Sequence, residues 1–460
     1  MVVGNVPEAA DFVVVGAGPG GYEAALSAAK MGRRVMLIDE AGEEGVGGVC
    51  LNVGCIPSKA LIELSERFHF LADASAIGLN TTGASVDMSA FQKWKRSVVH
   101  KLSSGVAGAL AKAKVSVRKG RARLISASSL VINDGEGGAQ FVDFKDIVLA
   151  TGSRPTLLKQ LPVDGSRIVD STGALAFDAL PKTVAVVGGG YIGLELGMAL
   201  SRLGAKVSVV EASGELIPSV DSRLVGPVSR QLKALGVDVY LNTLATGADD
   251  THLTIQSSEG EKLIAAEKIV VAVGRTPNTD DLGLEDANIP VNDQGLIEVA
   301  LDRRVSKHIA AIGDITPGPA LAHKASAESF VEVDALNGKN VAFEPQCIPA
   351  VVFTAPEIAT VGLTEREAKE AGYEVSVSRV PLGASGRAAT IGASLGFSQL
   401  VADKVDGTVL GVHLVGPHAS ELIAEAALAI ELGASAEDVG LTIHPHPTLS
   451  EQIAHIAAGV

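Results

Sequence analysis

One pattern occurs twice in this chain, and each copy combines a glycine-rich turn with an acid at a fixed distance. The first copy is DFVVVGAGPGGYEAALSAAKMGRRVMLIDE, and the second is TVAVVGGGYIGLELGMALSRLGAKVSVVEAS. In both, an apolar run leads into G-x-G-x-x-G, and a second apolar run ends 23 residues after the first glycine at an acid, Asp39 or Glu211. Short apolar runs predict buried strands, so we expect two parallel β–α–β units, each with a helix rich in small residues.

Each glycine of the turn has its own physical role in binding a dinucleotide. The first permits a tight turn, the second lets a pyrophosphate approach the backbone, and the third lets the helix pack closely on the strand. The phosphates sit at the helix N-terminus, and the acid accepts hydrogen bonds from ribose hydroxyls. Two turns without a ligand are the alternative, which the repeated context disfavours. The predicted binding residues are Gly16, Gly18, Gly21 and Asp39 in the first copy and Gly188, Gly190, Gly193 and Glu211 in the second.

Two dinucleotide sites in one chain predict two different dinucleotides. The simplest pairing is a bound flavin, FAD, that exchanges a hydride with a mobile nicotinamide. The second copy continues as EASGEL, with no arginine directly after Glu211. Because the Glu211 carboxylate would repel a 2′-phosphate, we expect NAD rather than NADP at this site.

Three further glycine turns each follow an apolar run. They are DIVLATGSRP (146–155), KIVVAVGRTPN (268–278) and HIAAIGDIT (308–316), and the first two support the internal duplication. In the third turn, Asp314 could bind a polyol hydroxyl or only cap the turn. From the residues alone, the cap is the favoured interpretation.

Two of the three cysteines lie close together in GGVCLNVGCIPSKAL (residues 47–61). A four-thiolate metal site is impossible because only Cys347 remains as a further thiol, and a mixed site would need histidines from the far end of the chain. A static disulfide between Cys50 and Cys55 would close a very short loop and stabilise little. Two packed cysteines in one polar, glycine-containing turn would be unusual. We therefore favour a redox-active disulfide and predict no metal site.

The spacing of these cysteines restricts the local backbone. Residues five apart in a regular α-helix differ by about 7.5 Å of rise, which exceeds the Cα separation of a disulfide, about 4.4–6.8 Å. The segment from Cys50 to Cys55 must therefore be irregular, and we expect a regular helix to begin near Pro57. Cys55 would then lie just before the helix N-terminus, where a thiolate is favoured, with the positive charge of Lys59 in the first turn.

The chain ends in LTIHPHPTLSEQIAHIAAGV, in which two histidines alternate with prolines. A surface turn is the simplest interpretation, and Thr448 with Glu451 has the pattern of a capping box for the last helix. A thiol–disulfide exchange, however, needs a base near neutral pH and a group that orients it. His446 and Glu451 would supply both, and the spacing alone leaves the two interpretations open.

The composition excludes several classes of protein. A net charge of −15 argues against nucleic acid as the main partner. No run of about 18 apolar residues is present, so we expect no membrane-spanning helix and no membrane partner. The start of the sequence lacks the pattern of a secretory or transit peptide, which predicts a cytoplasmic protein. A chain of 460 residues predicts two to four domains.

The order of these motifs resembles the class I pyridine nucleotide–disulfide oxidoreductases, which are flavin-dependent, and within them the branch that oxidises dihydrolipoamide. GAGPGG, GGVCLNVGCIPSKAL, ATGSRP, GGGYIGLELG, VAVGRTPN, AIGDIT, LAHKA and HPHPTLSE fall where this branch has them, over essentially the whole chain. The resemblance implies an α/β fold with two Rossmann-like dinucleotide-binding domains and a C-terminal α+β dimerisation domain. The implied boundaries are 1–150 for the FAD domain, 151–280 for the NAD domain, 281–345 for a central segment that completes the FAD domain, and 346–460 for the dimerisation domain.

The resemblance also implies roles for individual residues. Cys50 would exchange with the substrate, Cys55 would contact the flavin, and His446 would be the acid/base that Glu451 orients. In a homodimer, His446 would serve the cysteines of the other subunit.

Further residues are implied to bind the cofactors. Lys59 would lie near the flavin ring, paired with Glu195. The residues implied for FAD are Gly16, Gly18, Gly21, Asp39, Lys59, Gly120, Ala122, Gly152, Asp314 and Ala322. Those implied for NAD are Gly188, Gly190, Ile192, Gly193, Glu211, Gly274 and Arg275.

The implied activity is oxidation of protein-bound dihydrolipoamide to lipoamide with NAD+, on the lipoyl domains of a 2-oxo acid dehydrogenase or glycine cleavage complex. One alternative is a sister NAD(P)H-dependent reductase of another small disulfide, and another is a structural or regulatory flavoprotein subunit. Two residues depart from the family pattern. Tyr191 follows GGG where many members of this branch carry a smaller aliphatic residue, and Asp39 replaces the usual Glu.

Overall fold

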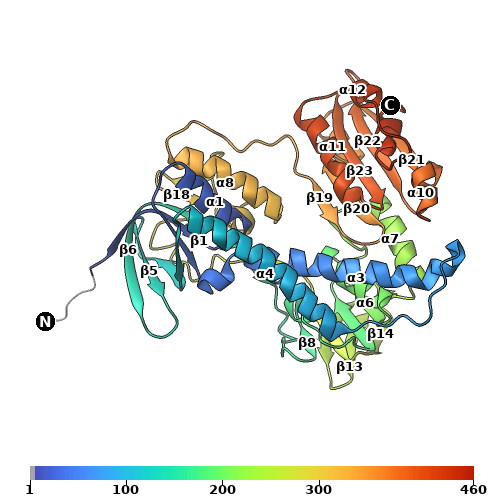
Figure 1. Cartoon of the computed structure of the whole chain (residues 1–460), viewed down its shortest axis with the longest axis horizontal. Helices are drawn as coiled ribbons and strands as arrows, with labels where there is room; N and C mark the ends of the chain where they lie inside the picture. Colours follow the sequence, from blue (N-terminus) through green and yellow to red (C-terminus); the bar gives the residue numbers. More distant parts are fainter. Residues whose placement is uncertain (1–5) are drawn as a thin grey trace. The chain divides into compact units, whose positions relative to one another are not determined.

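The computed structural model describes residues 6–460, except the side chains of residues 72 and 73, and the chain divides into two compact units (Figure 1). Unit 1 contains the described residues up to Ala60, together with Asp87–Thr156 and Gly274–Glu344. Unit 2 contains Leu61–Val86, Leu157–Val273 and Pro345–Val460. Each unit is therefore assembled from segments that are far apart in the sequence.

Unit 1 is built on a sheet with the strand order β17-β18-β6-β1-β2-β3, in which every neighbouring pair except β17–β18 is parallel. The first repeat forms β1 (Glu8–Val15), α1 (Pro19–Lys30) and β2 (Val35–Asp39), so the predicted parallel β–α–β unit is confirmed. Helices α1 and α8 lie side by side, as Figure 1 shows. The other elements of this unit are β3 (Ser116–Lys119), β4 (Arg121–Leu124), β5 (Ser129–Asn133), β6 (Ala139–Leu149), β7 (Ser153–Pro155), β16 (Arg275–Pro277), β17 (Arg304–Ser306), β18 (Ile309–Ala311), α2 (Gly48–Asn52), α4 (Met88–Lys112) and α8 (Ala322–Leu336), while α3 (Cys55–Asp73) begins in unit 1 and continues into unit 2.

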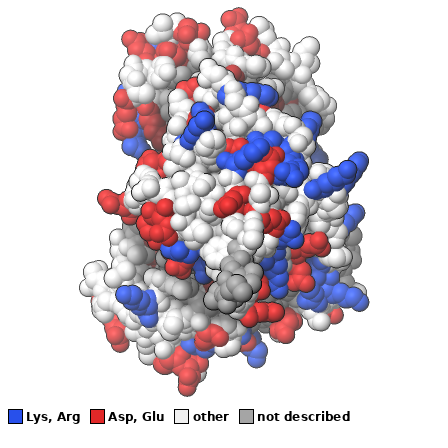
Figure 2. Space-filling model, turned by 90° about the vertical axis from the view of Figure 1, so that its left-hand side faces the viewer, with Lys and Arg blue, Asp and Glu red and all other residues white. Residues whose placement is uncertain are grey.

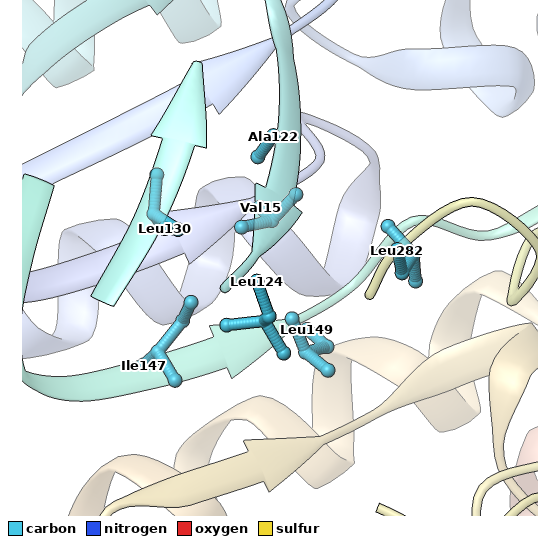
Figure 3. A pocket seen from close by; sticks show the side chains of 7 residues that line it. All are labelled: Val15, Ala122, Leu124, Leu130, Ile147, Leu149 and Leu282. Atoms are coloured by element: carbon cyan, nitrogen blue, oxygen red, sulfur yellow. The ribbon is translucent and has the colours of Figure 1, made fainter. Parts of the chain in front are cut away.

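The central strands of this sheet are buried on both faces because their side chains alternate between two apolar layers. In β1, Phe12 and Val14 pack with the small residues of α1, whereas Val13 and Val15 face the second layer. Figure 3 shows part of that second layer, where seven apolar side chains meet: Val15, Ala122, Leu124, Leu130, Ile147, Leu149 and Leu282. Each large aliphatic side chain buried in this way contributes about 1.5–3 kcal/mol. This layer therefore stabilises the sheet.

Unit 2 contains the second repeat in a sheet of its own, with the strand order β11-β10-β9-β15-β8 and parallel pairing throughout. The elements β9 (Thr183–Val187), α6 (Tyr191–Arg202) and β10 (Lys206–Val210) confirm the second predicted β–α–β unit. A separate antiparallel sheet has the order β12-β13-β14. The remaining elements of this part are β8 (Ile168–Val169), α5 (Ser171–Leu175), α7 (Ser222–Ala234), β11 (Asp238–Tyr240), β12 (Leu244–Ala248), β13 (His252–Ser257), β14 (Gly260–Ala265) and β15 (Lys268–Val271).

The C-terminal part of unit 2 is an antiparallel sheet with the order β19-β20-β23-β22-β21. The strands β22 (Phe397–Asp403) and β23 (Val409–Gly416) pair antiparallel and form a hairpin. Helix α11 (Ala419–Glu431) packs on this sheet through Ile423, Ala426 and Ile430. The other elements here are β19 (Ala350–Val352), β20 (Glu357–Gly362), β21 (Val375–Pro381), α9 (Glu365–Glu370), α10 (Gly386–Thr390), α12 (Ala436–Leu441) and α13 (Glu451–Ala457).

The predicted fold class is confirmed, with two Rossmann-like units and a C-terminal α+β sheet. The four domain boundaries stay predictions. The chain passes from unit 1 to unit 2 after Thr156, returns to unit 1 at Gly274, and enters unit 2 again after Glu344. Residues 61–86 also belong to unit 2.

Candidate active site

The first and third glycines of each turn are required by the backbone. Gly16 and Gly188 have φ angles of +103° and +111°, in the left-handed region that favours glycine. A Cβ at either position would also lie 2.3 Å from a backbone carbonyl oxygen of a neighbouring segment. A Cβ at Gly21 or Gly193 would lie 1.8 or 2.1 Å from the carbonyl oxygen of the first glycine, so a side chain is excluded there too. These contacts hold α1 and α6 closely against their strands.

The middle glycines differ because they border open space. A Cβ at Gly18 or Gly190 would meet nothing within 4 Å. Each residue is the N-cap of its helix, α1 or α6, and no side chain caps either helix end. Free N–H groups and an open approach at a helix N-terminus are what a pyrophosphate needs. The residues present in both turns therefore fit a dinucleotide.

Asp39 and Glu211 accept equivalent backbone hydrogen bonds in the two repeats. The N–H of Ala17 donates to Asp39 Oδ2 (3.1 Å), and the N–H of Gly189 donates to Glu211 Oε2 (2.6 Å). The other oxygen of each acid accepts from the N–H two residues further along, at 3.0 and 2.7 Å. Both acids are thus held beside their glycine turns, where ribose hydroxyls can donate to the remaining lone pairs.

The two cysteines lie on successive helical segments. Cys50 is within α2, Cys55 is the first residue of α3, and the helix is interrupted at Val53 and Gly54. The predicted irregular backbone between the cysteines is confirmed, whereas the predicted helix start near Pro57 is wrong. The N–H of Ser58 donates to the carbonyl oxygen of Gly54 (2.9 Å), and this bond begins α3 two residues earlier.

No disulfide joins Cys50 and Cys55 in this structure, and the surroundings of Cys50 shift its pKa. The hydrogen bond with Cys55, burial, and the negative charge of Cys55 raise the pKa of Cys50 well above its usual value, and the Lys59 ammonium opposes this shift. Cys55 is the first residue of α3, and the N-terminus of a helix favours a thiolate over a thiol. The third thiol is different: burial and the nearby Glu431 carboxylate raise the pKa of Cys347 to about 11.

Asp314 does not cap its own turn, so the interpretation favoured from the residues alone is wrong. The short 3₁₀ turn Gly313–Ile315 has no side-chain cap. Instead, Asp314 Oδ2 accepts a hydrogen bond from the hydroxyl of Ser153 (2.5 Å), and Arg275 Nε donates to the same hydroxyl (2.7 Å). Ser153 lies on β7 and Arg275 on β16, which pair directly after Gly152 and Gly274. Sequence reasoning missed Ser153, although it stands inside the ATGSRP motif.

The remaining residues expected at the cofactors are spread over several elements. Gly120 has φ +145° and donates its N–H to the carbonyl oxygen of Asp39 (3.0 Å), beside the acid of the first repeat. The Ala122 side chain points into the apolar layer of Figure 3, so only its backbone is available to a ligand. Ala322 is the first residue of α8, and Ile192 is the second residue of α6.

Lys59 and Glu195 belong to different units, and their pairing stays a prediction. Lys59 is the fifth residue of α3 and lies just beyond the first turn, because the helix begins two residues earlier than predicted. Glu195 is buried in α6, where its Oε1 accepts a hydrogen bond from the N–H of Phe353 (2.9 Å). Within unit 2, Glu195 therefore ties α6 to the start of the C-terminal sheet.

The tail brings His446 and Glu451 together. His446 Nδ1 lies 2.8 Å from Glu451 Oε1, and Glu451 Oε2 accepts the N–H of Thr448 (2.9 Å). Only half of the predicted capping box forms, because the Thr448 hydroxyl donates to the carbonyl oxygen of Pro445 instead. The N–H of Thr448 and then His446 lower the pKa of Glu451, which stays a carboxylate. The His446 side chain is 80% exposed, so its Nε2 is open to groups outside the subunit's own core.

A second histidine of the tail is anchored by contacts that the sequence did not reveal. His444 has a side chain only 6% exposed; its Nδ1 lies 2.8 Å from the carbonyl oxygen of Thr442, and its Nε2 lies 2.7 Å from Glu425 Oε1 on α11. The HPHP motif singles out both histidines, but no local pattern identifies the distant Glu425. This anchor fixes the turn that presents His446.

Charged side chains of both signs are exposed on the surface (Figure 2). Acidic and basic side chains are intermixed on the face shown in Figure 2, with no uniformly basic surface there. Among the helices of residues 6–460, none combines the length and apolar character needed to cross a bilayer.

Comparisons with known proteins cover the whole chain. A dihydrolipoyl dehydrogenase of Geobacillus stearothermophilus is 44% identical, over 100% of this chain and 98% of the relative. One of Haloferax volcanii is 41% identical, over 99% and 97%. The crystal structure of LpdA from Mycobacterium tuberculosis matches with a TM-score of 0.90 at 27% identity, over 98% and 99%. The HOCl-induced flavoprotein disulfide reductase RclA from Escherichia coli matches with a TM-score of 0.86 at 26% identity, over 97% and 99%.

Two family profiles divide the chain between them. Residues 10–329 match the pyridine nucleotide-disulphide oxidoreductases, and residues 348–457 match the dimerisation domain of the same family. The first match contains both glycine turns and the cysteine pair, and the second contains His446 and Glu451. The chain therefore belongs to the pyridine nucleotide-disulphide oxidoreductase family and uses FAD and NAD as cofactors.

Proposed function

We propose that this protein oxidises dihydrolipoamide groups to lipoamide and delivers the electron pair to NAD+. The observation that carries the proposal is the Cys50–Cys55 pair at the start of α3, in a chain 44% identical over its whole length to a dihydrolipoyl dehydrogenase. FAD supplies the two-electron link between the thiols and the nicotinamide when it is bound. Gly16, Gly18 and Asp39 would hold FAD, and the matching residues of the second repeat would hold NAD.

The thiol chemistry follows from the unequal cysteines. In the oxidised protein, Cys50 and Cys55 form a disulfide, and His446 takes a proton from one substrate thiol. The resulting thiolate attacks the sulfur of Cys50, the Cys50–Cys55 bond breaks, and Cys55 leaves as the stabilised thiolate. The second substrate sulfur then displaces Cys50, which forms the cyclic disulfide of lipoamide and leaves Cys50 protonated.

The base is proposed to act on a second copy of the chain. His446 is 80% exposed, and it lies in the segment that matches the dimerisation domain of the family. An exposed base needs a second protein surface that places the substrate thiol beside it. We therefore infer a homodimer in which His446 of one subunit serves Cys50 of the other.

The natural substrate is proposed to be the dihydrolipoyl group on the lipoyl domains of a 2-oxo acid dehydrogenase or glycine cleavage complex. The alternative, a reductase of another small disulfide, is kept because the matched RclA structure is described as a disulfide reductase. The cytoplasmic location stays a prediction.

A substrate panel tests the proposal. With NAD+ as acceptor, free dihydrolipoamide and reduced lipoyl domains should be oxidised, whereas reduced glutathione should give little turnover. With dihydrolipoamide as substrate, NADP+ should give little turnover in place of NAD+. Cys50→Ser should abolish this reaction and leave NADH oxidation by artificial acceptors, while Cys347→Ser, the matched control, should keep both activities. A preference for glutathione, or full dihydrolipoamide turnover by Cys50→Ser, would refute the assignment.

A further inference from the structure

The hydroxyl of Ser153 is fully engaged between two charged groups. It donates its hydrogen to Asp314 Oδ2 (2.5 Å) and accepts a hydrogen bond from Arg275 Nε (2.7 Å). Arg275 also donates through a second nitrogen to the carbonyl oxygen of Ser153 (2.5 Å). Ser153 is only 4% exposed, so water cannot readily replace either partner. A hydrogen bond to a charged group is stronger than one between neutral groups, and the low dielectric of a buried site strengthens it further.

The position of this triad in the chain is informative. Ser153 lies on β7, three residues before the chain leaves unit 1 at Thr156, and Arg275 lies on β16, one residue after the chain returns at Gly274. The two strands pair antiparallel, and Asp314 comes from a third segment after β18. The Ser153 hydroxyl therefore joins the ribbon formed by the two connecting strands to the acid expected at FAD.

We propose that Ser153 is a positioning residue for FAD: its hydroxyl, oriented by Arg275, fixes the Asp314 carboxylate so that the free Oδ1 faces the ribityl hydroxyls. This inference rests on the proposed function only in placing FAD beside Asp314. Because Asp314 Oδ2 is occupied by Ser153, one carboxylate oxygen is reserved for the ligand. Without the hydroxyl, the carboxylate can rotate, and Nε of Arg275 loses its acceptor while the bond to the Ser153 carbonyl oxygen remains.

The test measures release of FAD from the holoenzyme, followed as flavin fluorescence after dilution. Ser153→Ala should accelerate FAD release by about tenfold or more, as expected for loss of a hydrogen bond to a charged group. Asp314→Asn should also accelerate release, and the double variant should release FAD no faster than Asp314→Asn alone, because Ser153 acts through Asp314. A merely structural role would give independent, multiplying effects.

A matched control and a second variant keep the test decisive. Thr156→Val removes a hydroxyl from the same ribbon, where Thr156 and Thr276 share a hydrogen bond of 2.9 Å, and should leave FAD release within twofold of wild type. Arg275→Met leaves Ser153 and Asp314 in place and should accelerate FAD release several-fold. In the Ser153→Ala background, the same substitution should have no further effect on FAD release. Unchanged release by Ser153→Ala, or multiplying effects in the double variant, would overturn the proposal. Dihydrolipoamide turnover of the wild-type protein is measured in a separate assay. Failure of the proposed function would therefore be distinguished from failure of the proposed role of Ser153 in FAD binding.

Discussion

Nδ1 of His446 lies 2.8 Å from Oε1 of Glu451, five residues further along the chain. The other oxygen of Glu451 accepts the N–H of Thr448 (2.9 Å), so the same carboxylate both begins α13 and orients the imidazole. The ring nitrogen that remains, Nε2, is the one available to a substrate thiol. The geometry thus assigns one residue two functions, a helix end and the positioning of a base.

Replacement of this pair should affect turnover unequally. His446→Gln should lower kcat with dihydrolipoamide by about 10²–10⁴-fold, the range for loss of a general base. Glu451→Gln keeps an oxygen that can accept from Thr448 but loses the charge that orients the imidazole, so its loss should be smaller. Steady-state kinetics, with circular dichroism to show intact folding, would measure both. Wild-type turnover in Glu451→Gln would contradict the proposed positioning role.

Cys347 should react slowly with alkylating reagents near neutral pH. Because burial and Glu431 raise the pKa of Cys347 to about 11, only a small fraction is thiolate near pH 8. Its alkylation by iodoacetamide should therefore accelerate about tenfold per pH unit between pH 8 and 10. Mass spectrometry of the alkylated peptide would give the rates, and the Glu431→Gln variant should move the profile toward lower pH. A plateau in the wild-type rate near pH 9 would be inconsistent with this environment.

Glu332 should destabilise the folded protein at neutral pH. It is fully buried on α8, and neither of its carboxylate oxygens has a hydrogen-bond partner. Burial raises the pKa of Glu332, so the folded protein keeps a proton that the unfolded chain releases above about pH 4.3. The penalty therefore grows as the pH rises above this value. An unpaired buried polar group costs about 1–3 kcal/mol.

The corresponding variants separate the two parts of this cost. Glu332→Leu should raise the apparent Tm, and by more at pH 8 than at pH 5. Glu332→Gln also removes the titration but keeps an unpaired polar group, so its rise should be smaller than that of Glu332→Leu by an amount nearly independent of pH. Thermal denaturation at both pH values provides the measurement. A lower Tm of Glu332→Leu at pH 8 would show that this carboxyl has a stabilising partner.

Local patterns predicted the parts of this structure that depend on neighbouring residues. The strand–turn–helix units at Gly16 and Gly188 were predicted because the tight turn, the helix and the acid are all encoded within one repeat.

Contacts between distant segments could not be predicted in this way. Ser153 meets Asp314 across 161 residues, and no periodicity marks that distance. The start of α3 at Cys55 depends on a backbone bond to Gly54, which no side-chain pattern specifies. The capping box of the tail formed only in part, because the Thr448 hydroxyl has a competing acceptor in Pro445.

The most direct test of the central claim uses a hybrid dimer. Cys50→Ser and His446→Gln chains, each inactive alone, are co-expressed with different tags, and the mixed dimer is purified through both. If His446 of one subunit serves Cys50 of the other, the hybrid contains one intact site. It should then oxidise dihydrolipoamide with NAD+ at about half the wild-type rate per dimer. A hybrid as inactive as its two parents would contradict the account.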